Sequence, residues 1–357
     1  AVRETATRPP EIAMWDSMTN RQSTTGPAKL AGLFAVEGLG DDVLTMLELN
    51  CLLLSAYCRV KTMVFLRNMQ KCIIHDYLSQ TSMPSSQTEN TCVTPADVER
   101  RFGGLSRLYG PHALDYLGSA HVAVVGIGGV GSWAAEALAR NGVGALTVVD
   151  LDHIAESNVN RQVHALTETL GRSKVLAMSE RILAINPRCK VVTIDDFLTP
   201  ENVAICLPPE VNAVIDCTDQ MAAKVAMVLH AKAHKIPLIV CGGAGGKTDS
   251  LALRAGDLVE ATHDALLARL RNVLRRNHGY PRAVDEHGKP RKRVAKLGVR
   301  VLWVDQPTIL PAAWQQNDPL QGLSCAGYGS SVTVTASMGF AAANQVLELL
   351  LATHSKN

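Results

Sequence analysis

The sequence has no pair of cysteines in a C-x-x-C arrangement, although nine cysteines are scattered along its 357 residues. Structural zinc sites are commonly built on such pairs, and small secreted domains carry dense sets of disulfides. The cysteine pattern therefore argues against a zinc knuckle and against a disulfide framework. We expect a reducing compartment and place the protein in the cytoplasm.

The chain also lacks a strong charge of either sign, since its formal net charge is +2. Any affinity for nucleic acid must then come from a local basic patch. Long apolar runs are scarce: residues 43–66 are interrupted by Glu48, Arg59 and Lys61 and fall short of the roughly 18–20 apolar residues of a membrane helix. We expect the apolar helix over 332–351 to dock on the core, with a peripheral membrane contact as the alternative.

Two parts of the chain differ in composition. Residues 1–94 begin with a stretch rich in Pro, Ser, Thr and charge, and predict a partly disordered extension. In residues 95–357 short apolar runs alternate with helical patterns. This alternation predicts an α/β domain, namely a Rossmann-like, doubly wound, mostly parallel sheet with a mixed C-terminal part.

The most informative stretch is residues 121–150, HVAVVGIGGVGSWAAEALARNGVGALTVVD. An apolar run, glycines spaced G-x-G-x-x-G, strong helix formers, a second apolar run and an acid follow in the order of a mononucleotide-binding βαβ unit. Gly126 permits a tight turn, Gly128 lets phosphate approach the backbone, and Gly131 lets helix and strand pack closely. Asp150 lies where such units place their ribose ligand. The stretch predicts a nucleotide site without identifying the nucleotide.

Further polar residues follow the predicted strands. Asn158 and Arg161 lie in the loop after the second strand, and Lys174 begins the next helix. Because ligands bind beyond the carboxyl ends of strands in such sheets, Arg161 and Lys174 are candidates to hold a polyphosphate. Asp219 is a candidate Mg²⁺ ligand, since Mg²⁺ prefers carboxylate and phosphate oxygens. Asp216 is a weaker candidate, and helix capping is the structural alternative for both acids.

Taken together, GIGGVGS, the acid at 150, NVNRQ, GRSK and DCTDQ resemble the E1-like family, whose members adenylate carboxylates. From Arg101 to about Ala343 the chain is most similar to the tRNA threonylcarbamoyladenosine dehydratase branch of that family. The motifs that carry this resemblance include RFGGLSRLYG, NVNRQVHAL, DDFLTPENV, PLIVCGGAGG and SCAGYGSSVTVTASMGF. Residues 1–96 have no counterpart in it.

The resemblance implies an ATP site, a bound Mg²⁺ ion and roles for individual residues. The implied nucleotide-binding residues are Gly126, Gly128, Gly129, Gly131, Asp150, Asn158, Arg161 and Lys174. The implied catalytic residues are Arg161, Lys174 and Asp219, of which Asp219 would hold the metal. The implied partners are tRNA carrying threonylcarbamoyladenosine, a second copy of the chain in a homodimer, and a candidate sulfur-transfer protein.

The implied substrate is the threonylcarbamoyl group on adenosine 37 of tRNA. A carboxylate is a poor electrophile until attack on an ATP phosphate converts it to an activated acyl group. Attack from within the same side chain would then close a ring with net loss of water, and such intramolecular attack needs no enzyme nucleophile. Cys217, Cys241 and Cys325 are candidates for a transient thioester, or are small buried hydrophobic residues.

A tRNA substrate needs basic surface, and basic residues gather between 269 and 293 with few acids among them. The candidate tRNA-binding residues are Arg275, Arg276, Arg291, Lys292 and Arg293. The alternative interpretation of this run is a solvated face.

Three other functions remain open. An E1-like enzyme acting on a sulfur-carrier or ubiquitin-like protein is the first, but paired zinc cysteines are absent and Gly104 stands where such enzymes carry the second arginine of R-Y-x-R-Q. An NAD-dependent dehydrogenase is the second, and it would leave Arg161, Lys174 and Asp219 without a purpose. A non-catalytic scaffold with a nucleotide site is the third.

Overall fold

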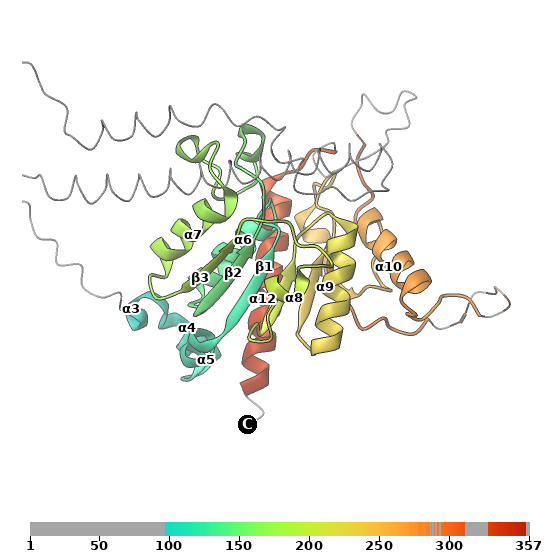
Figure 1. Ribbon diagram of the computed structural model, residues 1–357, viewed down its shortest axis with the longest axis horizontal. Coiled ribbons are helices and arrows are strands. Elements are labelled where there is room, and N and C mark those ends of the chain that lie inside the picture. The colour runs from blue at the N-terminus through green and yellow to red at the C-terminus, as the bar shows by residue number, and fades with distance from the viewer. Residues whose placement is uncertain are drawn as a thin grey trace, which may run out of the picture. The chain divides into compact units, whose positions relative to one another are not determined.

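The computed structural model describes residues 97–354, apart from 286, 288, 290, 293 and 311–327. The predicted extension over 1–94, Arg293 and Cys325 therefore lie outside the described residues. Within the described part, seven strands form one sheet in the order β3-β2-β1-β4-β5-β7-β6. Figure 1 shows this sheet with β1, β2 and β3 labelled and helices around it.

Six of the seven strands are parallel, and the seventh, β6, pairs antiparallel with β7. Their bounds are β1 His121–Val125, β2 Ala145–Val149, β3 Lys190–Ile194, β4 Ala213–Asp216, β5 Leu238–Cys241, β6 Leu253–Asp257 and β7 Arg300–Val304. Val122 and Val124 join the core on one face of the sheet, while Ala123 and Val125 join the core on the other. Burial on both faces explains why the central strands are apolar throughout. The predicted fold class, including the mixed C-terminal part, is confirmed.

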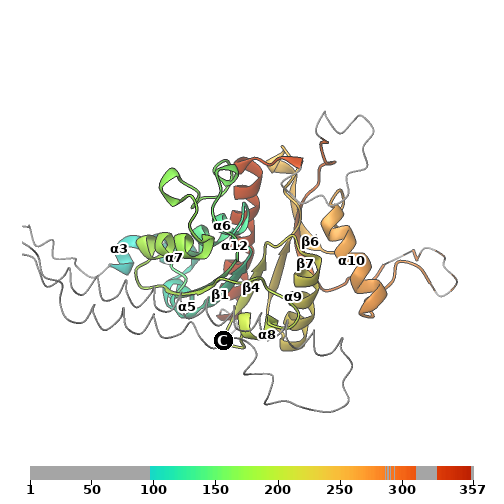
Figure 2. The same cartoon turned by 45° about the horizontal axis from the view of Figure 1, so that its top comes forward.

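Helices cover both faces of the sheet (Figure 2). One face carries α5 Ala113–Ser119, α6 Gly131–Arg140, α7 Lys174–Ile185 and α12 Val332–His354. The other carries α8 Val203–Cys206, α9 Met221–His234 and α10 Ala265–Asn277. Two short helices, α3 Val98–Phe102 and α4 Gly104–Tyr109, precede α5, and 3₁₀ turns lie at Glu156–Asn158, Thr167–Thr169 and Ser250–Ala252.

The long apolar helix α12 docks on the core, as predicted. Its stretch Val332–Ala352 is long and apolar enough to cross a membrane, but an apolar 18-residue segment of it is 56% buried within the protein. Met338, Ala342 and Val346 recur every four residues on its buried side and pack in the same core as the sheet. Gly339 permits close approach to α6, because a Cβ there would lie 2.5 Å from the carbonyl oxygen of Val130.

Two local features differ from what the sequence pattern suggests. The spacing over 105–117 predicts one helix, but the structure divides this segment into α4 and α5 at Gly110, whose φ of 103° favours glycine and which Pro111 follows. Strand β6 was not predicted, since its sequence LRAGD holds few apolar residues.

Candidate nucleotide-binding site

The first glycine loop, residues 126–131, joins β1 to α6, and its glycines are needed for different reasons. A Cβ on Gly126, whose φ is +87°, would lie 2.9 Å from the carbonyl group of Cys217, and a Cβ on Gly131 would lie 1.9 Å from the oxygen of Gly126. A Cβ on Gly128 would meet nothing closer than the side-chain nitrogen of Gln162 at 4.0 Å. Gly126 and Gly131 are therefore required by packing, whereas Gly128 leaves open space for a ligand.

A cavity of about 380 Å³ lies at the carboxyl ends of the central strands, bordered by this loop. Its volume is in the range of small-molecule sites. The predicted residues that line it are Gly126, Gly128, Gly129, Asp150, Asn158, Arg161, Lys174 and Asp219. Gly131 lies behind the loop at the start of α6. The fold thus brings together residues from distant parts of the sequence, since β2, β3 and β4 lie between Gly126 and Asp219 along the chain.

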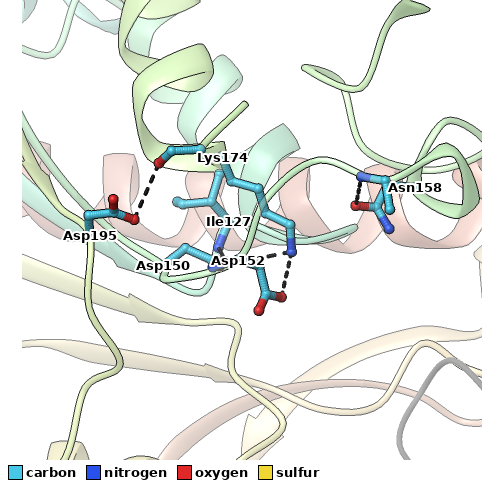
Figure 3. A network of polar contacts seen from close by, with 8 residues as sticks. Ile127, Asp150, Asp152, Asn158, Lys174 and Asp195 are labelled. Carbon is cyan, nitrogen blue, oxygen red and sulfur yellow. Dashed lines mark hydrogen bonds and ion pairs between the residues drawn. The ribbon is translucent and has the colours of Figure 1, made fainter. Parts of the chain in front are cut away.

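Asp150 is tied to the glycine loop (Figure 3). Its Oδ2 accepts a hydrogen bond from the amide of Ile127 at 2.6 Å, and its Oδ1 accepts one from the amide of Asp152 at 2.9 Å. Burial raises the pKa of the Asp150 carboxyl above its ordinary value, and the nearby charge of Lys174 partly offsets this. The carboxylate is fixed at the cavity wall at the end of β2, the position expected of a ribose ligand.

Lys174 supplies a buried positive charge beside these acids. Its Nζ lies 2.7 Å from Asp152 Oδ2 and 3.8 Å from Asp150 Oδ1, and 5% of the residue is exposed. Asp152 also lines the cavity and was not identified from the sequence, although it stands only two residues beyond the predicted acid. The paired carboxylates hold the ammonium group in one place, as Figure 3 shows.

The loop after β2 shapes the next part of the wall. Asn158 is buried, and its side-chain oxygen accepts from the amide of Ala155 at 3.1 Å. The guanidinium of Arg161 donates to the carbonyl of Ser157 at 2.5 Å and to the side chain of Asn160 at 2.9 Å. These bonds fold the loop back on itself, so that the Arg161 cation lies at the cavity.

The two candidate metal ligands have different surroundings. Asp219 is exposed and lines the cavity. Asp216 is completely buried and lies 3.1 Å from the ammonium group of Lys224. No group of three or more His, Cys, Asp or Glu side chains in the described part of the chain is placed to hold a metal ion. One carboxylate at a cavity suits Mg²⁺ when phosphate and water oxygens complete its coordination. Asp219 fits this description, whereas the Asp216 carboxylate is engaged by Lys224.

A second glycine cluster, GGAGG at residues 242–246 after β5, borders the same cavity through Gly242 and Gly245. A Cβ on Gly242 would lie 2.1 Å from a carboxylate oxygen of Asp264, which also accepts from the amide of Gly243 at 2.9 Å. The other Asp264 oxygen caps α10 at the amide of Leu267. The absence of a side chain at Gly242 thus serves packing.

Two of the candidate cysteines lie side by side: Cys217 lines the cavity and is half-buried, whereas Cys241 is buried. The sulfur atoms of Cys217 and Cys241 are 3.8 Å apart, on the neighbouring strand ends of β4 and β5. The hydrogen bond between the thiols, together with burial, raises the pKa of Cys217 well above its ordinary value. Because the thiolate is the nucleophile, the raised pKa argues against a thioester role for Cys217.

His164, in the same NVNRQVHAL motif as Arg161, is a buried histidine. It is 2% exposed, and neither ring nitrogen has a hydrogen-bond partner among the described residues. Burial lowers its pKa from 6.5 to about 4, and the charges of Lys174 and Arg181 act in the same direction. In the unfolded chain the His164 imidazole is therefore protonated below about pH 6.5, whereas in the folded protein it stays neutral down to about pH 4.

We expect the His164→Leu variant to lose less stability on acidification than the wild type. The contribution of His164 is complete above the unfolded pKa and declines as the pH falls, by about 2 kcal/mol at pH 5. Urea denaturation at pH 8 and pH 5 measures the difference, with His234→Gln at an exposed position of α9 as the control. Equal pH dependence in the wild type and His164→Leu would contradict the assignment.

The predicted basic residues differ in exposure. Arg275 is half-buried and donates to the carbonyl of Pro281 at 3.0 Å, and Arg291 likewise donates to the carbonyl of Val284 at 3.2 Å. Arg276, Arg291 and Lys292 are exposed. Arg269, about two helical turns before Arg276 on α10, is exposed as well.

Comparison with known proteins identifies close relatives. The ThiF family is matched over residues 103–357. The tRNA threonylcarbamoyladenosine dehydratase of Haemophilus influenzae is 40% identical over 256 residues, which cover 71% of this chain and 95% of that protein. The Escherichia coli protein of the same name is 41% identical over 261 residues, covering 71% of this chain and 94% of that protein. A crystal structure of the E. coli dehydratase in complex with ATP matches with a TM-score of 0.64 at 39% identity, covering 74% of this chain and all of that one.

Proposed function

Because the chain belongs to the ThiF family, we propose that it is an ATP-dependent tRNA threonylcarbamoyladenosine dehydratase. One observation carries the proposal: a glycine loop, a fixed acid, two cations and an exposed carboxylate converge on one cavity. Its substrate is the threonylcarbamoyl group on adenosine 37 of tRNA. An NAD-dependent dehydrogenase would have no use for the cations and the exposed carboxylate.

Each residue has a role in this reaction. Asp150 accepts hydrogen bonds from the ribose hydroxyls, and the space beside Gly128 admits the phosphates. Lys174 and Arg161 stabilise the negative charge that develops on the phosphates when the substrate carboxylate attacks. Asp219 would hold Mg²⁺, which would neutralise phosphate charge. Asn158 keeps the loop of Arg161 in shape.

The activation step explains why a dehydratase needs ATP. Oxide is a very poor leaving group, so the carboxylate becomes reactive only after its oxygen has been joined to phosphate. Attack on the activated carboxyl by another group of the same side chain then closes a ring and expels the phosphate together with the former carboxylate oxygen. Water has been removed overall, at the cost of one phosphoanhydride bond of ATP. During ring closure, the cavity holds the activated carboxyl close to the attacking group of the same side chain. This proximity favours the intramolecular reaction.

The deciding experiment is incubation of the full chain with ATP, Mg²⁺ and tRNA that carries threonylcarbamoyladenosine, followed by mass analysis of the nucleosides. Loss of one water from the modified adenosine is the expected result. A parallel incubation replaces the tRNA by a small carrier protein with a Gly-Gly tail. Unchanged nucleosides together with ATP turnover stimulated by the carrier would favour the sulfur-carrier alternative instead.

The exposed basic residues, with their neighbour in sequence Arg293, form the proposed tRNA-docking surface, which we define as Arg269, Arg276, Arg291, Lys292 and Arg293. Arg275 stays a candidate beside this surface, half-buried and with its Nε donor bonded to the carbonyl of Pro281. The homodimer, the sulfur-transfer partner and the cytoplasmic location are further parts of the proposal that rest on the family resemblance.

Reversing charge on this surface should weaken tRNA binding. We expect Arg269→Glu/Arg276→Glu to reduce affinity about tenfold or more and to lower the salt slope by roughly one per lost phosphate contact. Filter binding over a range of salt concentrations measures both. Arg188→Glu is the control, because Arg188 is exposed beside β3 at the other edge of the sheet. Unchanged affinity and salt slope in the double variant would place the tRNA elsewhere.

A further inference from the structure

Among the described residues, Lys224 on α9 has the largest side chain that is completely buried. Its ammonium group lies 3.1 Å from Asp216 Oδ1 and donates to the carbonyl oxygen of Cys241 at 2.9 Å. A buried ammonium costs several kcal/mol unless it is paired and hydrogen-bonded. An apolar residue would fill this space without that cost, so the two contacts call for an explanation beyond packing.

The first contact controls the turn that carries Asp219. The Asp216 oxygen that faces Lys224 also accepts from the amide of Thr218 at 3.0 Å and from its hydroxyl at 2.8 Å. These bonds fold the chain sharply at the end of β4, and both Thr218 and Asp219 then line the cavity. Lys224 therefore fixes the carboxylate on which the turn depends.

The same turn lies directly against the first glycine loop. The amide of Cys217 donates to the carbonyl of Val125 at 2.8 Å, and the carbonyl of Cys217 occupies the space beside Gly126. A displacement of the turn would therefore push on the loop that admits phosphate.

The second contact reaches the next strand. Cys241 is the last residue of β5, and Gly242, which follows it, lines the cavity. The ammonium group of Lys224 thus joins the carboxyl ends of β4 and β5 from behind. Through these two bonds it connects the Asp219 turn with the second glycine cluster, both of which border the cavity.

Lys224 also determines the charge behind the cavity. An unpaired Asp216 carboxylate at the end of β4 would repel the phosphates of a bound nucleotide, because the low-dielectric interior screens charge weakly. Paired with Lys224, Asp216 adds no net charge. Asp219 then remains as the carboxylate of this turn that faces the cavity.

We propose that Lys224 is a positioning residue for nucleotide and metal binding: it holds the Asp219 turn against β5 and cancels the charge of Asp216. The inference rests on the proposed ATP-dependent function and adds a residue to it. Lys224 does not line the cavity, so it acts through Asp216, Thr218 and Cys241 without touching the nucleotide.

The test is calorimetric titration of the full chain with ATP at several Mg²⁺ concentrations. We expect Lys224→Met to bind ATP at least about tenfold more weakly and to need more Mg²⁺, while Lys224→Arg stays within about threefold of the wild type. Lys232→Met is the matched control. Lys232 lies on the same helix as Lys224, but its ammonium group is exposed and lies over the Tyr280 ring. Thermal unfolding of each variant gives the temperature range over which the variant is folded, and the titrations are done within that range.

If Lys224→Met fails to fold, Asp216→Asn/Lys224→Met replaces it, because the double variant leaves no unpaired buried charge. The introduced asparagine would keep an oxygen for Thr218, but the link to Cys241 is lost, so ATP binding should still be weakened about fivefold or more. Wild-type affinity and Mg²⁺ dependence in a folded variant that lacks Lys224 would overturn the inference alone. Failure of the wild-type chain to bind ATP would overturn the proposed function, and this inference with it.

Discussion

Replacing Lys174 with methionine should lower the rate of ATP-dependent dehydration by at least about 100-fold. The methionine keeps most of the aliphatic stem but removes an ammonium group held 2.7 Å from Asp152 and 3.8 Å from Asp150. Two carboxylates would then face the phosphates without their cation. The pKa of Asp150, already raised by burial, would rise further because Lys174 is the charge that lowers it. Single-turnover dehydration of modified tRNA is the measurement.

Lys190→Met is the control for this substitution. Lys190 is exposed at the beginning of β3, at the opposite end of the parallel strands from the cavity. The same loss of charge there should leave the rate unchanged. A correctly folded Lys174→Met variant that keeps more than about a tenth of the wild-type rate would remove Lys174 from the proposed mechanism.

Substituting alanine for the glycines at 131 and 128 should separate folding from nucleotide binding. A Cβ on Gly131 would lie 1.9 Å from the backbone oxygen of Gly126, and backbone cannot rotate away. We expect Gly131→Ala to lower the free energy of unfolding by roughly 2–4 kcal/mol and to abolish ATP binding. Gly118→Ala is its control, because a Cβ on Gly118 in α5 would meet nothing within 4 Å.

Gly128→Ala should behave differently. Its methyl group would project into the cavity, with the Gln162 nitrogen at 4.0 Å as its nearest neighbour. Stability should stay within about 1 kcal/mol of the wild type, while ATP affinity falls about tenfold or more because phosphate no longer reaches the backbone. Denaturation and ATP titration of the same preparations measure both quantities. ATP binding of Gly128→Ala at wild-type strength would mean that phosphate does not approach the loop there.

Much of the fold was predictable because buried parallel strands are apolar along their whole length. The runs that became β1, β2 and β4 could be recognised for this reason, as could the glycine loop between β1 and α6. Strand β6 could not, because it is an antiparallel edge strand whose two faces are less deeply buried. The break at Gly110 was overlooked although glycine followed by proline is a strong signal of a turn.

The candidate site was predictable where spacing along one segment sets the geometry. Asp150 follows the glycines at a distance fixed by one βαβ unit, and Asp219 follows a strand end. The pairing of Asp216 with Lys224 was missed, since it depends on α9 lying across two strands. One signal was present: Lys224 shares the buried face of α9 with Met227, Val228 and Ala231, where an unpaired lysine would be costly.

The docking of α12 sets an order for folding during synthesis. Every strand of the sheet leaves the ribosome before α12, yet α12 covers the face that α6 leaves open and packs against β4, β5 and β7. Until its last turns emerge, an apolar face of the sheet stays in contact with water or with chaperones. The cavity beside the glycine loop is consequently completed late, when Thr335 at the start of α12 reaches that loop.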